Sequence, residues 1–140
     1  DISKKDEELI ACAKDALYYA IDIIEDGMRF KELSKAIEDF ITSRGYQPLV
    51  RFCGHGIGRK PHEDPEIPNY LEHGGTKSGP KIKNGMVFCI EPMICQKDRN
   101  PVILKNGWDV VSADGLRGSH YEHTVAVVDG RAVILSNREN

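Results

Sequence analysis

The 140-residue sequence lacks an excess of basic charge, a long apolar run and an apolar leader. Its 19 Lys and Arg residues against 22 Asp and Glu residues give a formal net charge of −3, whereas nucleic-acid-binding proteins carry a basic surface. No stretch of about 18 apolar residues is present to cross a membrane, and the opening DISKKDEEL lacks the apolar core of a signal peptide. These absences argue against nucleic acid and membranes as partners and predict a cytoplasmic protein.

Cysteine is not arranged for a zinc knuckle or a disulfide framework. The four cysteines include no C-x-x-C pair and are widely separated, at Cys12, Cys53, Cys89 and Cys95. We therefore expect reduced thiols that pack against the rest of the chain.

The first third of the chain has the apolar period of two amphipathic helices. Apolar residues recur there at three- and four-residue spacing. Ser3 and Asp6 fit a capping box before the first helix, and Gly27 stands where that helix could stop. The second helix should end near Gly45. The predicted helices span about 4–26 and 30–44.

From Tyr46 onward the pattern changes to short strands and turns. YQPLVRFC, MVFCIEPMI, YEHTVAVV and RAVILS are short apolar runs, and Asp129-Gly130 between the last two is a strong tight-turn pair. The sequence thus predicts an α+β fold for one domain over residues 1–140. Its strand-rich part, 46–136, should form an antiparallel sheet backed by the helices.

Two of the predicted strands each contain one carboxylate among apolar neighbours. Glu91 lies in FCIEPMI and Glu122 lies in YEHTVAVV. A buried charge without compensation is expensive, so each carboxylate must be exposed, paired with a base, protonated or bound to a cation. An ion pair with a Lys or Arg from elsewhere in the fold stays open as an alternative. Side-chain alternation puts His123 on the face opposite Glu122 and Thr124, so we expect His123 to be packed rather than a ligand.

The segment GHGIGRKPH at residues 54–62 places two histidines in a glycine-rich loop. Its spacing differs from the phosphate-binding G-x-G-x-x-G, and the prolines that follow exclude the helix that such a motif requires. His62-Glu63 does not begin the H-E-x-x-H of zinc proteases, because no second histidine stands four residues on. What remains is imidazole from His55 and His62 together with Glu91 and Glu122. Such donors suit Mn, Fe, Co or Zn in a hydrolytic site.

Three blocks of the chain carry a family resemblance. GHGIGRKPHEDPEIPNY, GMVFCIEPMI and SHYEHTVAVV closely resemble, in this order, the metal-and-substrate blocks of the type I bacterial methionine aminopeptidases. The resemblance implies the pita-bread fold, a curved antiparallel sheet backed by helices, of which this chain resembles the carboxyl-terminal half. It also implies two divalent metal ions and removal of the initiator methionine from nascent polypeptides.

The same resemblance implies a role for each of five residues. His55, Glu91 and Glu122 correspond to metal ligands, and Glu122 corresponds to the ligand that bridges both ions. His62 resembles a catalytic histidine that contacts the substrate amide and the tetrahedral intermediate. Glu91 is in addition the candidate proton shuttle, and Trp108 resembles a wall of the methionine pocket.

The chain departs from the family in its ligand set. Two aspartate ligands of the family have no counterpart here, which implies a missing amino-terminal half and a chain that is inactive alone and assembles as a homodimer or larger. Pro61 replaces the family's aromatic residue before the second histidine. Two alternatives are a noncatalytic pita-bread module that binds peptides and an Xaa-Pro aminopeptidase or prolidase. Retention of the three ligands argues against the first, and the GHGIGR block and Trp108 argue against the second.

Overall fold

The computed structural model describes residues 2–137, in which two helices precede ten short strands. The helices are α1 (Lys4–Asp22) and α2 (Phe30–Ser43). The strands are β1 (Gln47–Pro48), β2 (Cys53–Gly56), β3 (Glu63–Pro68), β4 (Val87–Ile90), β5 (Met93–Cys95), β6 (Pro101–Ile103), β7 (Val110–Ser112), β8 (Gly118–His120), β9 (His123–Val128) and β10 (Arg131–Ile134).

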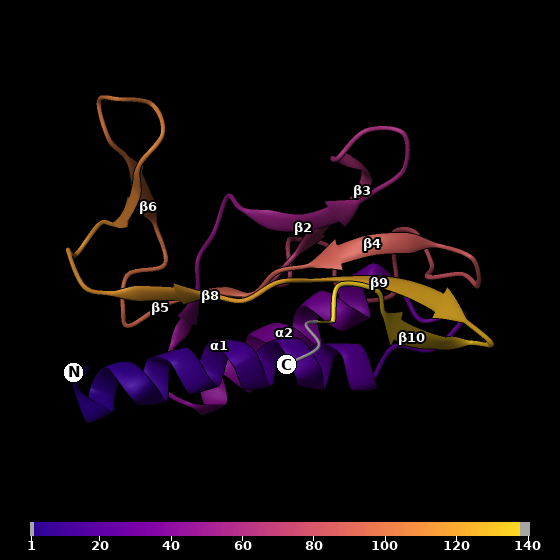
Figure 1. Cartoon of the computed structure of the whole chain (residues 1–140), viewed down its shortest axis with the longest axis horizontal. Helices are drawn as coiled ribbons and strands as arrows, with labels where there is room; N and C mark the ends of the chain where they lie inside the picture. The colour runs from indigo at the N-terminus through magenta and orange to yellow at the C-terminus, as the bar shows by residue number, and fades with distance from the viewer. Residues whose placement is uncertain (1, 138–140) are drawn as a thin grey trace.

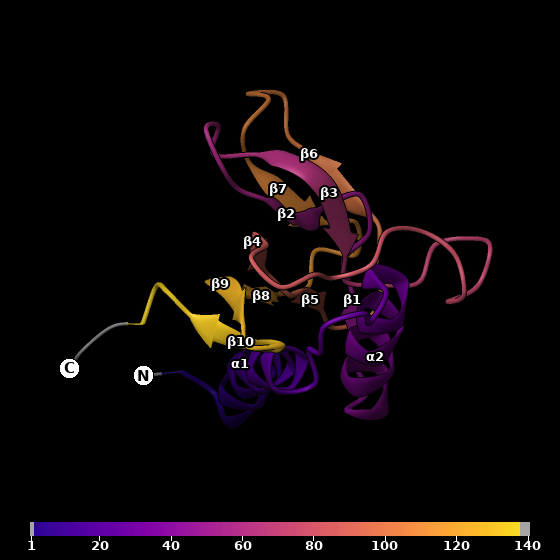
Figure 2. The ribbon, with the colours of Figure 1, turned by 90° about the vertical axis from the view of Figure 1, so that its right-hand side faces the viewer.

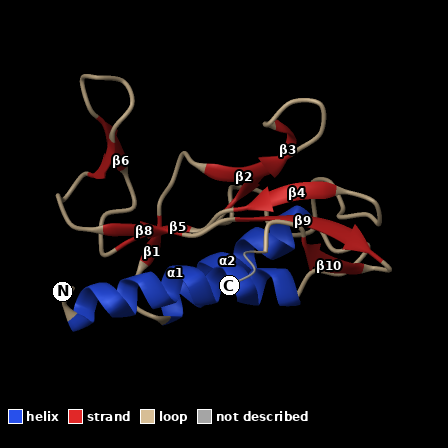
Figure 3. Cartoon of the chain, in the orientation of Figure 1, coloured by secondary structure: helices blue, strands red, loops and turns tan. Residues whose placement is uncertain are grey.

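The helices form one layer, and the strands lie on one side of it (Figures 1 and 3). Figure 2 shows β9 and β10 next to α1 and β2 farther from the helices, whereas β3 contacts α2. The apolar face of each helix supplies core residues such as Leu17 and Ile37, which pack with Phe88, Ile90 and Val125 from the sheet. Each of these side chains is at most 1% exposed, and burying such a side chain contributes about 1.5–3 kcal/mol. The predicted helix-backed antiparallel arrangement is therefore present.

Two antiparallel sheets meet at one junction, where β4 of one sheet leads into β5 of the other and β8 leads into β9. The five-stranded sheet has the order β10-β9-β4-β2-β3, and the three-stranded sheet has the order β1-β5-β8. Ile90 pairs with His123 on one side of the junction, and Met93 pairs with His120 on the other, so the same register continues through it. Strands β6 and β7 form a separate hairpin that projects away from the sheets (Figure 1).

The junction falls at the two carboxylates. We predicted uninterrupted strands through Glu91 and Glu122, but β4 ends just before Glu91 and β9 begins just after Glu122. Pro92 explains the break, since proline has no N–H to donate to a ladder. Because the register is continuous, Glu91 lies opposite Glu122 across the gap.

Helix α1 begins as predicted and ends earlier than predicted. Ser3 and Asp6 form the capping box, in which the Ser3 hydroxyl lies 2.7 Å from the Asp6 carboxylate. The helix stops at Asp22 rather than near residue 26 because the N–H groups of Asp26 and Gly27, which a longer helix would use, find tertiary partners. Asp26 N–H donates to the Gly130 carbonyl at 3.0 Å, and Gly27 N–H donates to the Ile82 carbonyl at 2.9 Å. The periodicity of apolar residues does not reveal these long-range hydrogen bonds, so it could not predict where the helix ends.

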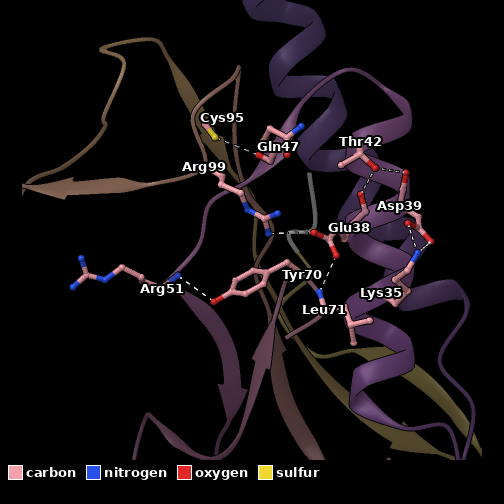
Figure 4. A network of polar contacts seen from close by, with 10 residues as sticks. All are labelled: Lys35, Glu38, Asp39, Thr42, Gln47, Arg51, Tyr70, Leu71, Cys95 and Arg99. Carbon is pink, nitrogen blue, oxygen red and sulfur yellow. Dashed lines mark hydrogen bonds and ion pairs between the residues drawn. The ribbon is translucent and has the colours of Figure 1, made fainter. Parts of the chain in front are cut away.

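Polar contacts fix α2 against the loops that follow β3 and β5 (Figure 4). The Glu38 carboxylate accepts a hydrogen bond from Leu71 N–H at 2.9 Å and pairs with Arg99 at 3.1 Å. The Arg99 guanidinium also lies over the Tyr70 ring, 5.1 Å from its centroid. These contacts hold the loop after β3 in place beside the sheet.

Within the described residues, neither helix is both long and apolar enough to cross a membrane.

Candidate metal centre

The register of three neighbouring strands places the predicted ligands on one face of the sheet. His55 of β2 lies opposite Cys89 of β4, and Cys89 lies opposite Thr124 of β9. Directly opposed residues of antiparallel strands point to the same face, and alternation carries that face two residues onward. Glu91 and Glu122 therefore share the face of His55.

The three predicted ligands converge. His55 Nε2 lies 3.3 Å from Glu91 Oε1, and each side chain is only 13–14% exposed. Donor atoms of Glu122 lie within 4.8 Å of those of His55 in one group and of those of Glu91 in another. Glu122 is thus the member common to both groups. Among residues 2–137, the ion pairs of Glu91 are with histidines and not with Lys or Arg.

His120 is a further member of this cluster that our sequence analysis missed. Its Nε2 lies 3.5 Å from Glu91 Oε2, so each oxygen of Glu91 faces an imidazole. The hydrogen bond with Glu91 raises the pKa of His120, against the opposing effect of burial. The sequence feature that could have identified His120 is its position two residues before Glu122, because this spacing puts both side chains on one face of an extended segment.

Cys89 also lies beside the centre, where its thiol is close to two of the predicted ligands. Its side chain is within 4.8 Å of the His55 and Glu122 donor atoms, and Sγ lies 3.4 Å from Thr124 Oγ1. Burial raises the pKa of the Cys89 thiol above its usual range, which favours the neutral form near pH 7. Cys89 is 3% exposed, as the sequence analysis expected for a packed cysteine.

His62 lies next to the ligand cluster but outside both ligand groups. Its ring centroid is 4.2 Å from that of His55. Both histidines line a cleft of about 560 Å³ together with Cys53, Lys60 and residues of β3. The His62 side chain is exposed, so it is accessible to a molecule entering this cleft.

Two other predicted positions lie apart from the cluster. His123 faces α1, where its Nε2 is 3.3 Å from the Tyr18 hydroxyl, and its Nδ1 is 2.9 Å from Ser136 Oγ in the segment after β10. It is packed on the opposite face, as expected from alternation. Trp108 is 87% exposed in the turn between β6 and β7, and the structure does not bring it together with the ligands.

The glycines around His55 are required by close backbone approach. A Cβ on Gly54 would lie 2.3 Å from the Cys89 carbonyl oxygen, and one on Gly56 would lie 2.1 Å from the Asp64 carbonyl oxygen. Real Cβ atoms do not tolerate such contacts, so β2 fits between β3 and β4 only with glycine at these positions. The glycine-rich segment therefore serves to insert His55 into the sheet.

We expect Gly56→Ala to destabilise the fold by about 1–3 kcal/mol, because the β3 backbone would have to move. Gly58→Ala is the matched control, since its Cβ would meet the mobile end of the Glu63 side chain at 2.6 Å rather than backbone. Urea unfolding of both variants measures the difference. Equal stabilities would mean that β2 is not held this tightly.

The donor set fits a divalent cation. His55 Nδ1 lies 2.9 Å from the Gly56 carbonyl, which can only accept, so Nδ1 carries a proton and Nε2 is the nitrogen that faces the Glu91 carboxylate. A proton on Nε2 makes this contact an ion pair, and without that proton a cation is needed between the Nε2 lone pair and the carboxylate. Neighbouring ligands held at about 2.0–2.2 Å from one tetrahedral ion lie about 3.3–3.6 Å apart, a range that includes the observed 3.3 Å.

Comparison with known proteins finds metallopeptidase relatives of this chain. The chain matches metallopeptidase family M24 over residues 1–129. It is 62% identical over 138 residues to a methionine aminopeptidase of Helicobacter pylori, a match that covers 98% of this chain and 54% of that protein. The crystal structure of methionine aminopeptidase from Thermotoga maritima superposes with a TM-score of 0.93 at 35% identity, covering 99% of this chain and 54% of that one.

A prolidase from Pyrococcus furiosus is less similar. Its TM-score is 0.73 at 26% identity, with 100% of this chain and 35% of that chain covered. The α+β pita-bread class that the sequence predicted is confirmed by these structural likenesses. The chain spans about half the length of the curated relatives it matches. Because the family match extends over most of the sequence, the chain belongs to metallopeptidase family M24.

Proposed function

We propose that this chain provides part of a dinuclear metal centre that removes the initiator methionine from nascent polypeptides in the cytoplasm. The observation that carries the proposal is the convergence of His55, Glu91 and Glu122 on one sheet face. Relatives that are named methionine aminopeptidases and match nearly the whole chain support it. Substrates are accordingly peptides that begin with methionine.

We assign His55, Glu91 and Glu122 as ligands of two divalent ions, which would be Co, Mn, Fe or Zn. Glu122 is the bridging ligand, an assignment supported by its membership of both ligand groups. When bound, such ions supply Lewis acidity that lowers the pKa of water and polarises a carbonyl. The two carboxylates would otherwise repel each other across the strand junction.

Three residues would act on the substrate itself. Glu91 would accept a proton from water and return it to the leaving amine, because a carboxylate at the edge of the centre can do both. His62, exposed in the cleft beside His55, would donate a hydrogen bond to charge that develops on the substrate amide. Trp108 would form a wall of the methionine pocket when the exposed indole is covered.

The described ligands supply two carboxylates, whereas two divalent ions carry four positive charges. We propose that the remaining ligands, the two aspartates of the family, come from residues outside this chain. The 140-residue chain alone would then bind metal weakly and be inactive. It would also form a homodimer or larger assembly, which the exposed apolar residues of the β6–β7 hairpin favour: Val102, Ile103, Val110 and Val111.

Peptide turnover tests the function. The protein at its natural length, loaded with Mn²⁺ or Co²⁺, should release methionine from Met-Gly-x peptides and leave Ala-Pro-x peptides largely intact. Preference for Ala-Pro-x would instead indicate an Xaa-Pro aminopeptidase or prolidase. Metal-loaded protein that binds Met-Gly-x without cleaving it would indicate a noncatalytic binding module.

A further inference from the structure

His120 is the one histidine of the cluster to which the family resemblance assigns no role. The Glu91 carboxylate is held between two imidazoles, His55 on Oε1 at 3.3 Å and His120 on Oε2 at 3.5 Å. We propose that His120 Nε2 is an additional ligand of the metal centre, in the part formed by Glu91 and Glu122. The inference rests on the proposed function only in requiring a divalent ion at these carboxylates.

The fold presents His120 to that position. It is the last residue of β8, directly opposite Met93 of β5, and the strand junction that follows it carries Glu122. Donor atoms of Glu91, His120 and Glu122 all lie within 4.8 Å of one another. An ion bound among them would have two carboxylate oxygens and one imidazole, a donor set that suits Mn, Fe, Co and Zn.

The distance supports ligation more than a structural ion pair. A separation of 3.5 Å between His120 Nε2 and Glu91 Oε2 is long for a charge-assisted hydrogen bond, which is usually about 2.7–2.9 Å. It lies within the spacing of about 3.3–3.6 Å between neighbouring ligands of one tetrahedral ion. The His120 side chain is 46% exposed, and such exposed pairs contribute only about 0–1 kcal/mol to stability.

His123 provides an internal contrast. It lies three residues farther along the same segment but on the other face, and its two ring nitrogens already face the Ser136 and Tyr18 hydroxyls. It has no access to the carboxylates. A substitution at His123 therefore controls for the loss of an imidazole from this segment without loss of a ligand.

Imidazole donation should also affect which metal is preferred. A nitrogen donor contributes more to Co²⁺ than to Mn²⁺, in line with the Irving–Williams order. Loss of even an outer-shell partner of a ligand costs about 10–100-fold in metal affinity, so loss of a direct nitrogen ligand should reach on the order of 100-fold for Co²⁺. The loss for Mn²⁺ should be smaller.

Cobalt titration of the natural-length apoprotein tests the assignment, with calorimetry and visible spectroscopy as readouts. His120→Gln should weaken one Co²⁺ equivalent about 100-fold and change the visible bands, whereas His123→Gln should match the wild type in both. His120→Cys should add a thiolate-to-cobalt charge-transfer band beyond any contribution of Cys89 to the wild-type spectrum, because the new thiol would take the ligand position. Circular dichroism verifies that each variant is folded.

Unchanged Co²⁺ affinity and spectrum in His120→Gln, with no new band in His120→Cys, would overturn the assignment. A protein that shows the His120-dependent spectrum but releases no methionine from Met-Gly-x would overturn the proposed function and leave this inference standing. Failure of the wild type to bind Co²⁺ at all would overturn both.

Discussion

Glu122→Ala is expected to abolish binding of both metal ions in the natural-length protein. Glu122 belongs to both groups of converging donors, so its loss removes a ligand from each ion at once. The affinity for Co²⁺ or Mn²⁺ should fall by more than about 100-fold, since a direct ligand matters more than the outer-shell partners that cost 10–100-fold. Calorimetric titration of apoprotein measures this affinity.

Two further variants sharpen this test. Glu122→Gln keeps the size of the side chain and removes its charge, so it should lose metal nearly as completely. Glu25→Ala removes a carboxylate that pairs with Arg131 at 2.8 Å and lies outside both donor groups, so metal binding should persist. Equal affinities in the wild type and Glu122→Ala would remove Glu122 from the ligand set.

His62→Ala is expected to leave metal affinity nearly intact and to lower kcat by about 10²–10³-fold. The magnitude is that of removing one donor to charge developing in a transition state. The reason for retained metal is that His62, although its ring lies 4.2 Å from that of His55, belongs to neither donor group. Methionine release at saturating metal and saturating Met-Gly-x gives kcat.

Lys60→Ala is the control for His62, because Lys60 is another basic residue lining the same cleft. It should change kcat little. A kcat for His62→Ala within a few-fold of the wild type would exclude a catalytic role, and a metal affinity as low as that of Glu122→Ala would make His62 a ligand instead.

The parts of the fold that follow from local chemistry could be predicted. Helical period and the Ser3–Asp6 capping box located the start of α1, and Asp129-Gly130 forms the β9–β10 turn with φ of 49° and 80°. The end of α1 could not be predicted, because Asp26 N–H and Gly27 N–H bond to residues more than fifty positions away. Contacts of that range leave no trace in a local pattern.

Part of the candidate site could be predicted because burying a lone carboxylate in an apolar segment costs free energy unless a base, a proton or a cation compensates its charge. That argument found Glu91 and Glu122, and the structure places them opposite each other. It missed His120, whose neighbours in the sequence are polar and raise no such conflict. It also gave no reason for Gly54 and Gly56, because the close approach of the β3 and β4 backbones is a property of the assembled sheet.

Trp108 shows the limit of assigning a position by resemblance alone. Its predicted role requires a pocket, yet its indole is 87% exposed on the β6–β7 turn. The pocket assignment therefore rests on the resemblance, whereas contacts within the described residues support the assignments of His55, Glu91 and Glu122.

Anomalous scattering from crystals of the natural-length protein grown with Mn²⁺ tests the central claim, that this sheet face holds a pair of divalent ions. Two peaks about 3.5–4 Å apart are expected, each about 2.0–2.2 Å from a Glu122 oxygen, with His55 Nε2 and a Glu91 oxygen in contact as well. Saturating Mn²⁺ that gives no peak between Glu91 and Glu122, with His55 Nε2 still 3.3 Å from Glu91 Oε1, would contradict the account.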